Sequence, residues 1–253
     1  MHRKHVSVFK DKKIIYTAFL FLFLTSAMIV IAMLFGKEAG SFVIRVQQGD
    51  LKHTIAITET NPEEEGVELT SKLTAPGFSN FTDYSPKWFL RNDYETINEY
   101  TAKGGLYAHT NHEQAGAGIS LYCYTFYVKN TSTSNAAVGV NVEMSYSNVT
   151  NYLDEIVRVM TYTYDEDGNE LVNIYQKSDE NYQPYEWYTM SDPKFFESKT
   201  QVFNSEQLYI NSGEYIKYSV IFWLEGDDPD SEKYGEALYG GTIKFDLTLK
   251  VQM

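Results

Sequence analysis

Short runs in which apolar and polar side chains alternate most limit what this sequence can fold into. In the run at 242–251, Ile243, Phe245, Leu247 and Leu249 fall on one side, and lysine, aspartate and threonine fall on the other. A period of two places successive side chains on opposite faces, as in a β-strand with one buried face. The pattern therefore predicts an all-β protein.

Similar runs occur at 41–47, 51–58, 119–129, 137–147, 155–164, 170–176, 201–210 and 214–224. Gln48-Gly49-Asp50 is expected to join the first two, and the Asp-Gly step in 165–169 predicts a hairpin. We expect irregular chain at 70–118, with a helical turn near 93–100, and a polar loop at 178–200. About nine short antiparallel strands predict a single antiparallel β-sandwich, jelly-roll-like in outline.

An uncharged apolar run of 22 residues, Ile14–Phe35, precedes the alternating part. As a helix it would span the hydrocarbon core of a bilayer, about 30 Å thick. Basic residues before it predict a cytoplasmic N-terminus by the positive-inside rule. We therefore expect a cytoplasmic segment at 1–13, a transmembrane signal-anchor helix at 14–35 and an extracellular domain at 36–253. The run exceeds the usual signal-peptide length, which favours an uncleaved anchor.

The net charge also differs between the N-terminal segment and the rest of the chain. The chain has 21 Lys and Arg against 34 Asp and Glu; five of the basic residues and one acid precede residue 36, so the remainder carries a net charge of −17. Such a domain repels nucleic acid and anionic headgroups. Cys123, the single cysteine, lies in an apolar run and is expected to be a small buried hydrophobe.

The sequence offers candidate ligands for two metals, zinc and calcium. A zinc peptidase would need more than the His109–His112 pair with Glu113, because the helical His-Glu-x-x-His pattern is absent. Calcium is the better candidate, because Glu225, Asp227, Asp228 and Asp230 put four carboxylates in six residues. A solvated turn after Trp223 is the alternative explanation.

Aromatic residues offer a binding surface. Tyr182, Tyr185, Trp187 and Tyr188 lie close together in the polar loop, and with Trp88 they could stack on a sugar or a partner protein. Covering one end of the sandwich is the competing interpretation.

Several short segments resemble exported, TasA/camelysin-related surface and matrix proteins of Gram-positive bacteria: 40–44, 124–130, 154–160, 222–230 and 240–243. The resemblance implies a β-sandwich and, as in TasA, fibre assembly through an N-terminal strand. Camelysin adds the alternative of a metal-dependent surface peptidase. The retained anchor departs from the family, as do the 92–116 insertion and the 178–200 loop, so this member would at most cap or anchor a fibre.

These observations predict a non-enzymatic, membrane-anchored surface protein that acts through protein or envelope contacts. The alternatives are the peptidase and a carbohydrate-binding module. No cofactor is expected other than calcium.

Overall fold

The computed structural model of this chain describes residues 16, 21, 23, 42–48, 53–75, 94–102, 104–110, 119–133, 135–177, 193–226, 228–238 and 240–252. The chain divides into two compact units, 1–39 and 40–253. Of the predicted membrane segment, only Tyr16, Phe21 and Phe23 are described, and all three are helical. Within the described part of the chain, no helix is long and apolar enough to cross a membrane.

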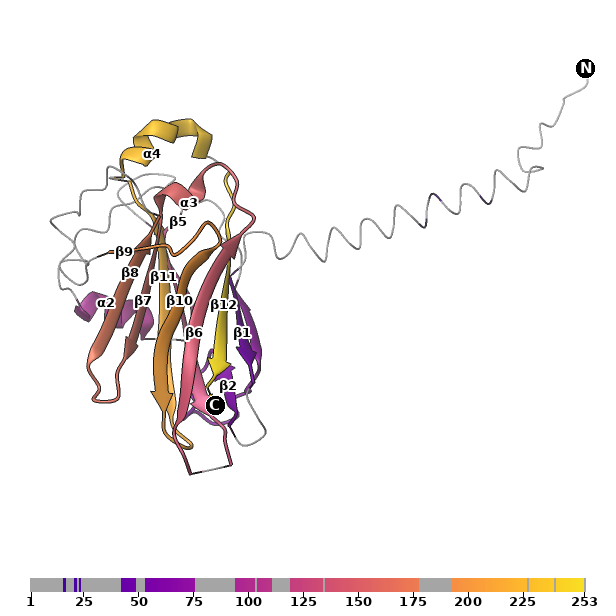
Figure 1. Cartoon of the computed structure of the whole chain (residues 1–253), viewed down its shortest axis with the longest axis vertical. Coiled ribbons are helices and arrows are strands. Elements are labelled where there is room, and N and C mark those ends of the chain that lie inside the picture. Colours follow the sequence, from indigo (N-terminus) through magenta and orange to yellow (C-terminus); the bar gives the residue numbers. More distant parts are fainter. Residues whose placement is uncertain are drawn as a thin grey trace, which may run out of the picture. The chain divides into compact units, whose positions relative to one another are not determined.

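The second unit is mostly β-strand, arranged as two sheets (Figure 1). Sheet A has the order β10-β6-β12-β1-β3, formed by Gln201–Ile210, Val138–Ser147, Lys244–Val251, Phe42–Gln47 and Lys72–Ala75. Sheet B has the order β2-β5-β11-β7-β8-β9, formed by Ile55–Thr58, Ile119–Asn130, Tyr215–Leu224, Val157–Tyr164, Glu170–Gln176 and Lys194–Phe195. Strand β4 (Gly105–Thr110) also pairs with β5.

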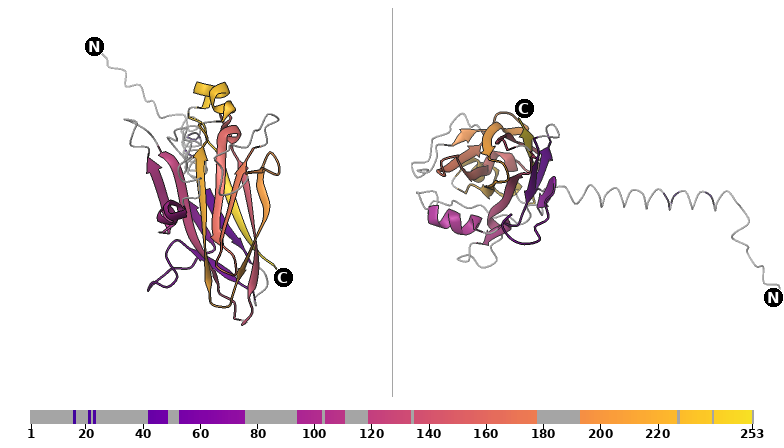
Figure 2. Two further views of the ribbon diagram at one scale, coloured as in Figure 1. Left: turned by 90° about the vertical axis from the view of Figure 1, so that its left-hand side faces the viewer. Right: turned by 90° about the horizontal axis from the view of Figure 1, so that it is seen from below.

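The described helices are short. Helix α2 (Tyr94–Thr101) lies outside the sheets, as the end-on view in Figure 2 shows. Helices α3 (Leu153–Ile156) and α4 (Pro229–Tyr234), with the 3₁₀ turn Gly235–Leu238, lie together at one end of the sandwich (Figure 1).

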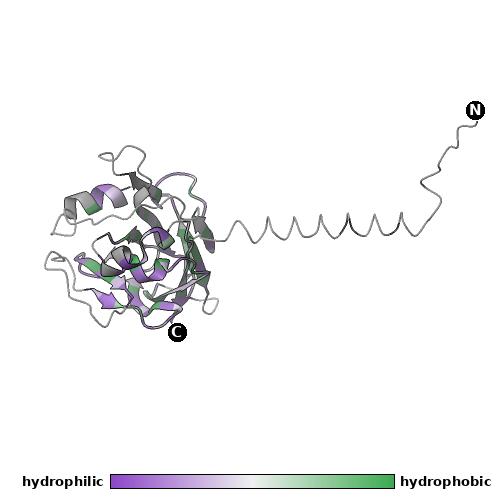
Figure 3. Cartoon of the chain, turned by 90° about the horizontal axis from the view of Figure 1, so that it is seen from above, coloured by the Kyte–Doolittle hydropathy of each residue, from purple (hydrophilic) through white to green (hydrophobic). Residues whose placement is uncertain are grey.

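The two sheets differ in how they are buried. Between them lies the main core, where Phe222 of sheet B packs against Phe42 and Phe245 of sheet A with ring centroids 5.2 and 4.7 Å apart. A second core lies on the outer face of sheet B, where Ile97 and Tyr100 of α2 cover apolar side chains. Sheet B is thus covered on both faces, whereas β6 and β12 alternate between buried and partly exposed residues. Green and purple residues intermix along the strands in Figure 3.

The runs at 119–129, 137–147, 170–176, 201–210, 214–224 and 242–251 are confirmed as strands, within a few residues at their ends. The hairpin across Asp165–Asn169 is confirmed, with Asp165 N donating to Asn169 O at 2.9 Å. The helical turn near 93–100 is confirmed as α2. The run 155–164 forms the end of α3 and then β7.

Other expectations are wrong. The runs at 41–47 and 51–58 do contain strands β1 and β2, but the two strands lie in different sheets, because β1 pairs with β12 and β3 in sheet A while β2 pairs with β5 in sheet B. Segment 70–118, expected to be irregular, contains β3 and β4. The sheets are not antiparallel throughout, since β1–β12 and β8–β9 are parallel pairs. Alternation identifies a strand but does not identify its neighbour.

Candidate functional site

The acidic loop after β11 is tied into the protein. The Glu225 carboxylate is fully buried, where Trp223 Nε1 donates to its Oε2 at 2.9 Å. Asp228 forms an ion pair with the buried guanidinium of Arg158 and also accepts the backbone N–H of Asp230 at 2.8 Å. The carboxylates of two of the four predicted calcium ligands, Glu225 and Asp228, therefore have specific roles in the fold.

Asp230, a third predicted ligand, pairs with Lys233 at 2.8 Å across one turn of α4. This bond is the main cause that raises the pKa of Lys233. Asp227 lies outside the described residues. Among the residues that are described, no group of three or more His, Cys, Asp or Glu side chains is placed to hold a metal. The calcium site remains a prediction from the sequence alone, and the partners of Glu225, Asp228 and Asp230 argue against it.

The structure describes only some of the other candidate site residues. Tyr182, Tyr185, Trp187, Tyr188 and Trp88 all lie outside the described residues, as do His112 and Glu113. His109 belongs to β4. Cys123 is fully buried on the outer face of sheet B, and burial raises the pKa of its thiol to about 12. A buried thiol of this kind is a poor nucleophile.

A polar cluster between the sheets was not anticipated. Glu206 of β10 points inward beside a register irregularity and accepts hydrogen bonds from hydroxyl and amide groups of sheet B. Its donors are Thr161 Oγ1 at 2.7 Å, Asn173 Nδ2 at 2.9 Å, Tyr175 OH at 2.7 Å and Tyr218 OH. Burial is the main cause that raises the pKa of the Tyr175 and Tyr218 hydroxyls, and the negative charge of Glu206 is the next largest cause. The cluster fastens edge strand β10 to sheet B.

A second cluster supports helix α2. Lys217 Nζ lies 3.3 Å from Thr101 Oγ1 and 5.5 Å from the ring centroid of Tyr164. Tyr162 OH donates to Glu170 Oε1 at 2.5 Å, and Asn98 of α2 lies beside both tyrosine hydroxyls. Burial lowers the pKa of Lys217. These contacts bind the helix to sheet B, in keeping with cation–π attraction in a half-buried site.

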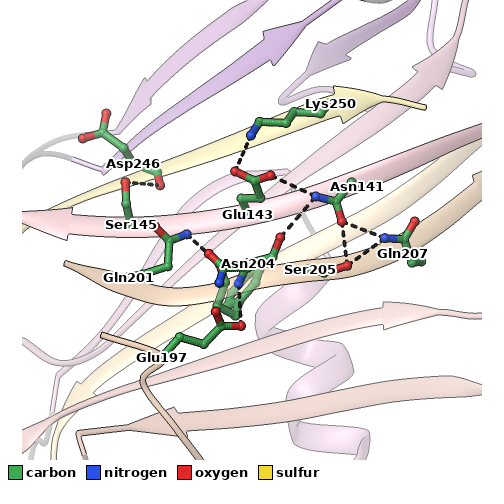
Figure 4. Close-up of polar contacts among 11 residues, drawn as sticks. Asn141, Glu143, Ser145, Glu197, Gln201, Asn204, Ser205, Gln207, Asp246 and Lys250 are labelled. Carbon is green, nitrogen blue, oxygen red and sulfur yellow. Dashed lines mark hydrogen bonds and ion pairs between the residues drawn. The ribbon is translucent and has the colours of Figure 1, made fainter. Parts of the chain in front are cut away.

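The outer face of sheet A carries a network of polar side chains (Figure 4). Asn141 of β6 is at its centre: its Oδ1 accepts from Ser205 Oγ and Gln207 Nε2, both at 2.7 Å, and its Nδ2 donates to Glu143 Oε1 at 3.1 Å. Gln207 Nε2 also lies 2.7 Å from Ser205 Oγ. Amide and hydroxyl groups from two strands are thereby held in fixed orientations.

Five charged side chains on this face are paired with one another. Lys250 Nζ lies 2.5 Å from Glu143 Oε2, Arg45 pairs with Asp246, and Lys244 Nζ lies 3.6 Å from the second oxygen of Asp246. These pairs leave little unbalanced charge over β1, β6 and β12, although the domain as a whole is acidic.

One aromatic ring stands on the same face. Tyr209 is 53% exposed and lies opposite Gly139 in the β10–β6 pair. A Cβ on Gly139 would lie 3.6 Å from Tyr209 Cε1 and 3.1 Å from Gln252 Oε1. The missing side chain leaves room for the ring and for the Gln252 amide. Tyr209 and Gln207 are two residues apart on one strand and share this face.

No protein-family model matches this chain, and a search of curated proteins finds no match.

Proposed function

We propose that this chain is a non-catalytic surface protein whose β-sandwich binds an uncharged polysaccharide of the cell envelope or matrix through the outer face of sheet A. The supporting observation is the combination of exposed Tyr209 with the hydrogen-bonded amides and hydroxyls beside it. Sugars stack on aromatic rings and pair their hydroxyls with such groups.

The charges on this face favour an uncharged polymer over a polyanion. Three basic side chains of the face, Arg45, Lys244 and Lys250, are paired with carboxylates of the same face. A polyanion would have to break these pairs and would meet the net negative charge of the domain. An uncharged glycan requires neither change.

Display on the cell surface, with the apolar run at 14–35 as an uncleaved anchor, is part of the same proposal and rests on the sequence. The proposed relation to the TasA/camelysin proteins and the proposed jelly-roll outline also rest on the sequence. For a fibre role, β1 is informative: Phe42, Val43 and Ile44 are fully buried, and the strand is paired on both edges within its own chain. We propose that β1 stays in place and that the protein acts as a single unit.

The test is co-sedimentation of the purified full-length chain with insoluble uncharged polysaccharides, including wall glycan. We expect saturable binding that is competed by soluble oligosaccharide and barely weakened by added salt. Binding that disappears at moderate salt would instead indicate a charged partner, and self-association without glycan binding would indicate a second copy. EDTA-sensitive casein cleavage would contradict the proposal and favour the peptidase.

A further inference from the structure

Lys194, Asn173 and Glu206 form a chain of contacts across three strands. Lys194 Nζ of β9 donates to Asn173 Oδ1 of β8 at 2.6 Å. On the other side of the carboxamide, Asn173 Nδ2 donates to Glu206 Oε1 of β10 at 2.9 Å. A primary amine thus touches one side of an amide group whose nitrogen faces a carboxylate.

The distances approach those needed for reaction. Because a C=O bond is about 1.2 Å long, Lys194 Nζ lies within about 3.8 Å of Asn173 Cγ, close to the roughly 3–3.5 Å of a near-attack arrangement. The acceptor group is also held in place, because Glu206 is fixed by Tyr175, Thr161 and Tyr218. Residue 194 is paired directly with Tyr175, two residues from Asn173 on the same strand.

Other lysines of the domain make a different kind of contact. Lys177, Lys233 and Lys250 each lie against carboxylates. A carboxylate resists attack by an amine, whereas a carboxamide can release ammonia. The arrangement at Lys194 therefore permits chemistry that these ion pairs do not.

We propose that Lys194 and Asn173 join in an intramolecular amide bond, with Glu206 relaying the proton. The neutral amine of Lys194 attacks Cγ of Asn173 and forms the new C–N bond. Glu206 accepts a proton from the attacking nitrogen and delivers it to Nδ2, the Cγ–Nδ2 bond breaks, and one ammonia leaves. Nothing is oxidised or reduced.

The bond would strengthen the weakest described edge of sheet B. Strand β9 pairs with β8 through only two residues, Lys194 and Phe195. An amide link between positions 173 and 194 would close the chain between them into a covalent loop. In the chain-entropy view, such a link stabilises the fold by restricting the unfolded chain. This inference does not depend on the proposed glycan binding.

Mass spectrometry of the purified full-length chain tests the proposal. We expect an intact mass lower than the sequence mass by one ammonia, after allowing for N-terminal processing. A protease digest should contain one branched peptide that carries both Lys194 and Asn173. The branched peptide distinguishes this bond from other reactions that release ammonia.

Lys194→Arg and Asn173→Ala should restore the full mass, and Glu206→Gln should slow the loss of ammonia. The matched control is Lys177→Arg, which removes a part-buried lysine that contacts Asp154 and Glu155 and should leave the branched peptide intact. A folded chain that gives separate, unmodified Lys194 and Asn173 peptides even after prolonged incubation at alkaline pH would overturn the proposal.

Discussion

The hydroxyl of Tyr218 on β11 donates a hydrogen bond to Glu206 on β10, and this bond joins the two sheets across the main core. Tyr218 is fully buried, so its hydroxyl depends on this acceptor rather than on water. The tyrosine rings supply apolar packing, and Glu206 accepts hydrogen bonds from their polar ends. The closure of the sandwich at β10 thus depends on a carboxylate as well as on apolar contact.

Glu206→Ala should therefore destabilise the fold strongly. Each buried donor left without an acceptor costs about 1–3 kcal/mol, and Tyr218 is the most buried of the donors. Chemical denaturation of the variant and the parent measures the loss. Glu143→Ala, on the outer face of sheet A, is the control and should cost about 1 kcal/mol or less, because its pairing with Lys250 is partly exposed. Equal losses for the two variants would contradict the role given to Glu206.

The Trp223–Glu225 pair predicts the outcome for calcium. Glu225 is committed to the indole N–H, Asp228 to Arg158 and Asp230 to Lys233, so a calcium ion would have to displace existing partners. We expect millimolar calcium to leave the Tm unchanged. Glu225→Ala should lower the unfolding free energy by about 1–3 kcal/mol, because Trp223 Nε1 loses its buried acceptor. A calcium-dependent rise in Tm that Glu225→Ala abolishes would establish the metal site instead.

Gly104 marks a point of close backbone approach. A Cβ there would lie 1.4 Å from the carbonyl oxygen of Glu59, an overlap that only backbone movement relieves. Gly104→Ala should cost about 3 kcal/mol or more. Gly66→Ala is the comparison: its φ of +77° strains an alanine, but nothing lies within 4 Å, so we expect about 1–2 kcal/mol. Thermal or urea unfolding should give a clearly lower unfolding free energy for Gly104→Ala than for Gly66→Ala.

High pH should destabilise the protein through its buried acids. Burial raises the pKa of Cys123 from 9.0 to about 12, and the folded state therefore holds this proton more tightly than the unfolded state does. Its contribution is complete below pH 9 and is lost as the pH rises toward 12, at up to about 1.4 kcal/mol per pH unit. Tyrosines with raised pKa values, including Tyr218, add to the loss above pH 10.

Two measurements check this. Iodoacetamide should not label Cys123 in the folded chain at pH 8 but should label it in urea. Cys123→Ala should flatten the fall in stability between pH 9 and 12, leaving the tyrosine contribution. Rapid labelling of the folded chain at pH 8 would contradict the assigned burial.

Local patterns in the sequence correctly predict many of the strands and one hairpin. The alternation in β12 and the Asp-Gly turn at 165–169 act within a few residues, and both are found as predicted. The partner of β1 was not predictable from alternation, since its neighbour β12 lies at the far end of the chain. The Glu206 cluster was missed because its members come from four strands, and each looks like an ordinary strand residue in the sequence.

The acidic loop shows the converse. Its carboxylates suggested a cation site because their spacing is visible in the sequence, whereas the partners that engage them, Trp223, Arg158 and Lys233, become evident only in the folded chain. Composition indicates which ligands a loop could offer, and the fold decides which of them remain available.

The most direct test of the proposed function compares two equally exposed tyrosines. Tyr209 and Tyr152 are both 53% exposed, but Tyr209 stands on the outer face of sheet A, whereas Tyr152 precedes α3 and stacks on Tyr234. Affinity of each full-length alanine variant for the insoluble glycan should be measured by depletion. We predict that Tyr209→Ala weakens binding about 5- to 150-fold, as expected for a lost stacking contact of about 1–3 kcal/mol, while Tyr152→Ala binds like the parent. Unchanged binding by a folded Tyr209→Ala variant would contradict the assignment of this face.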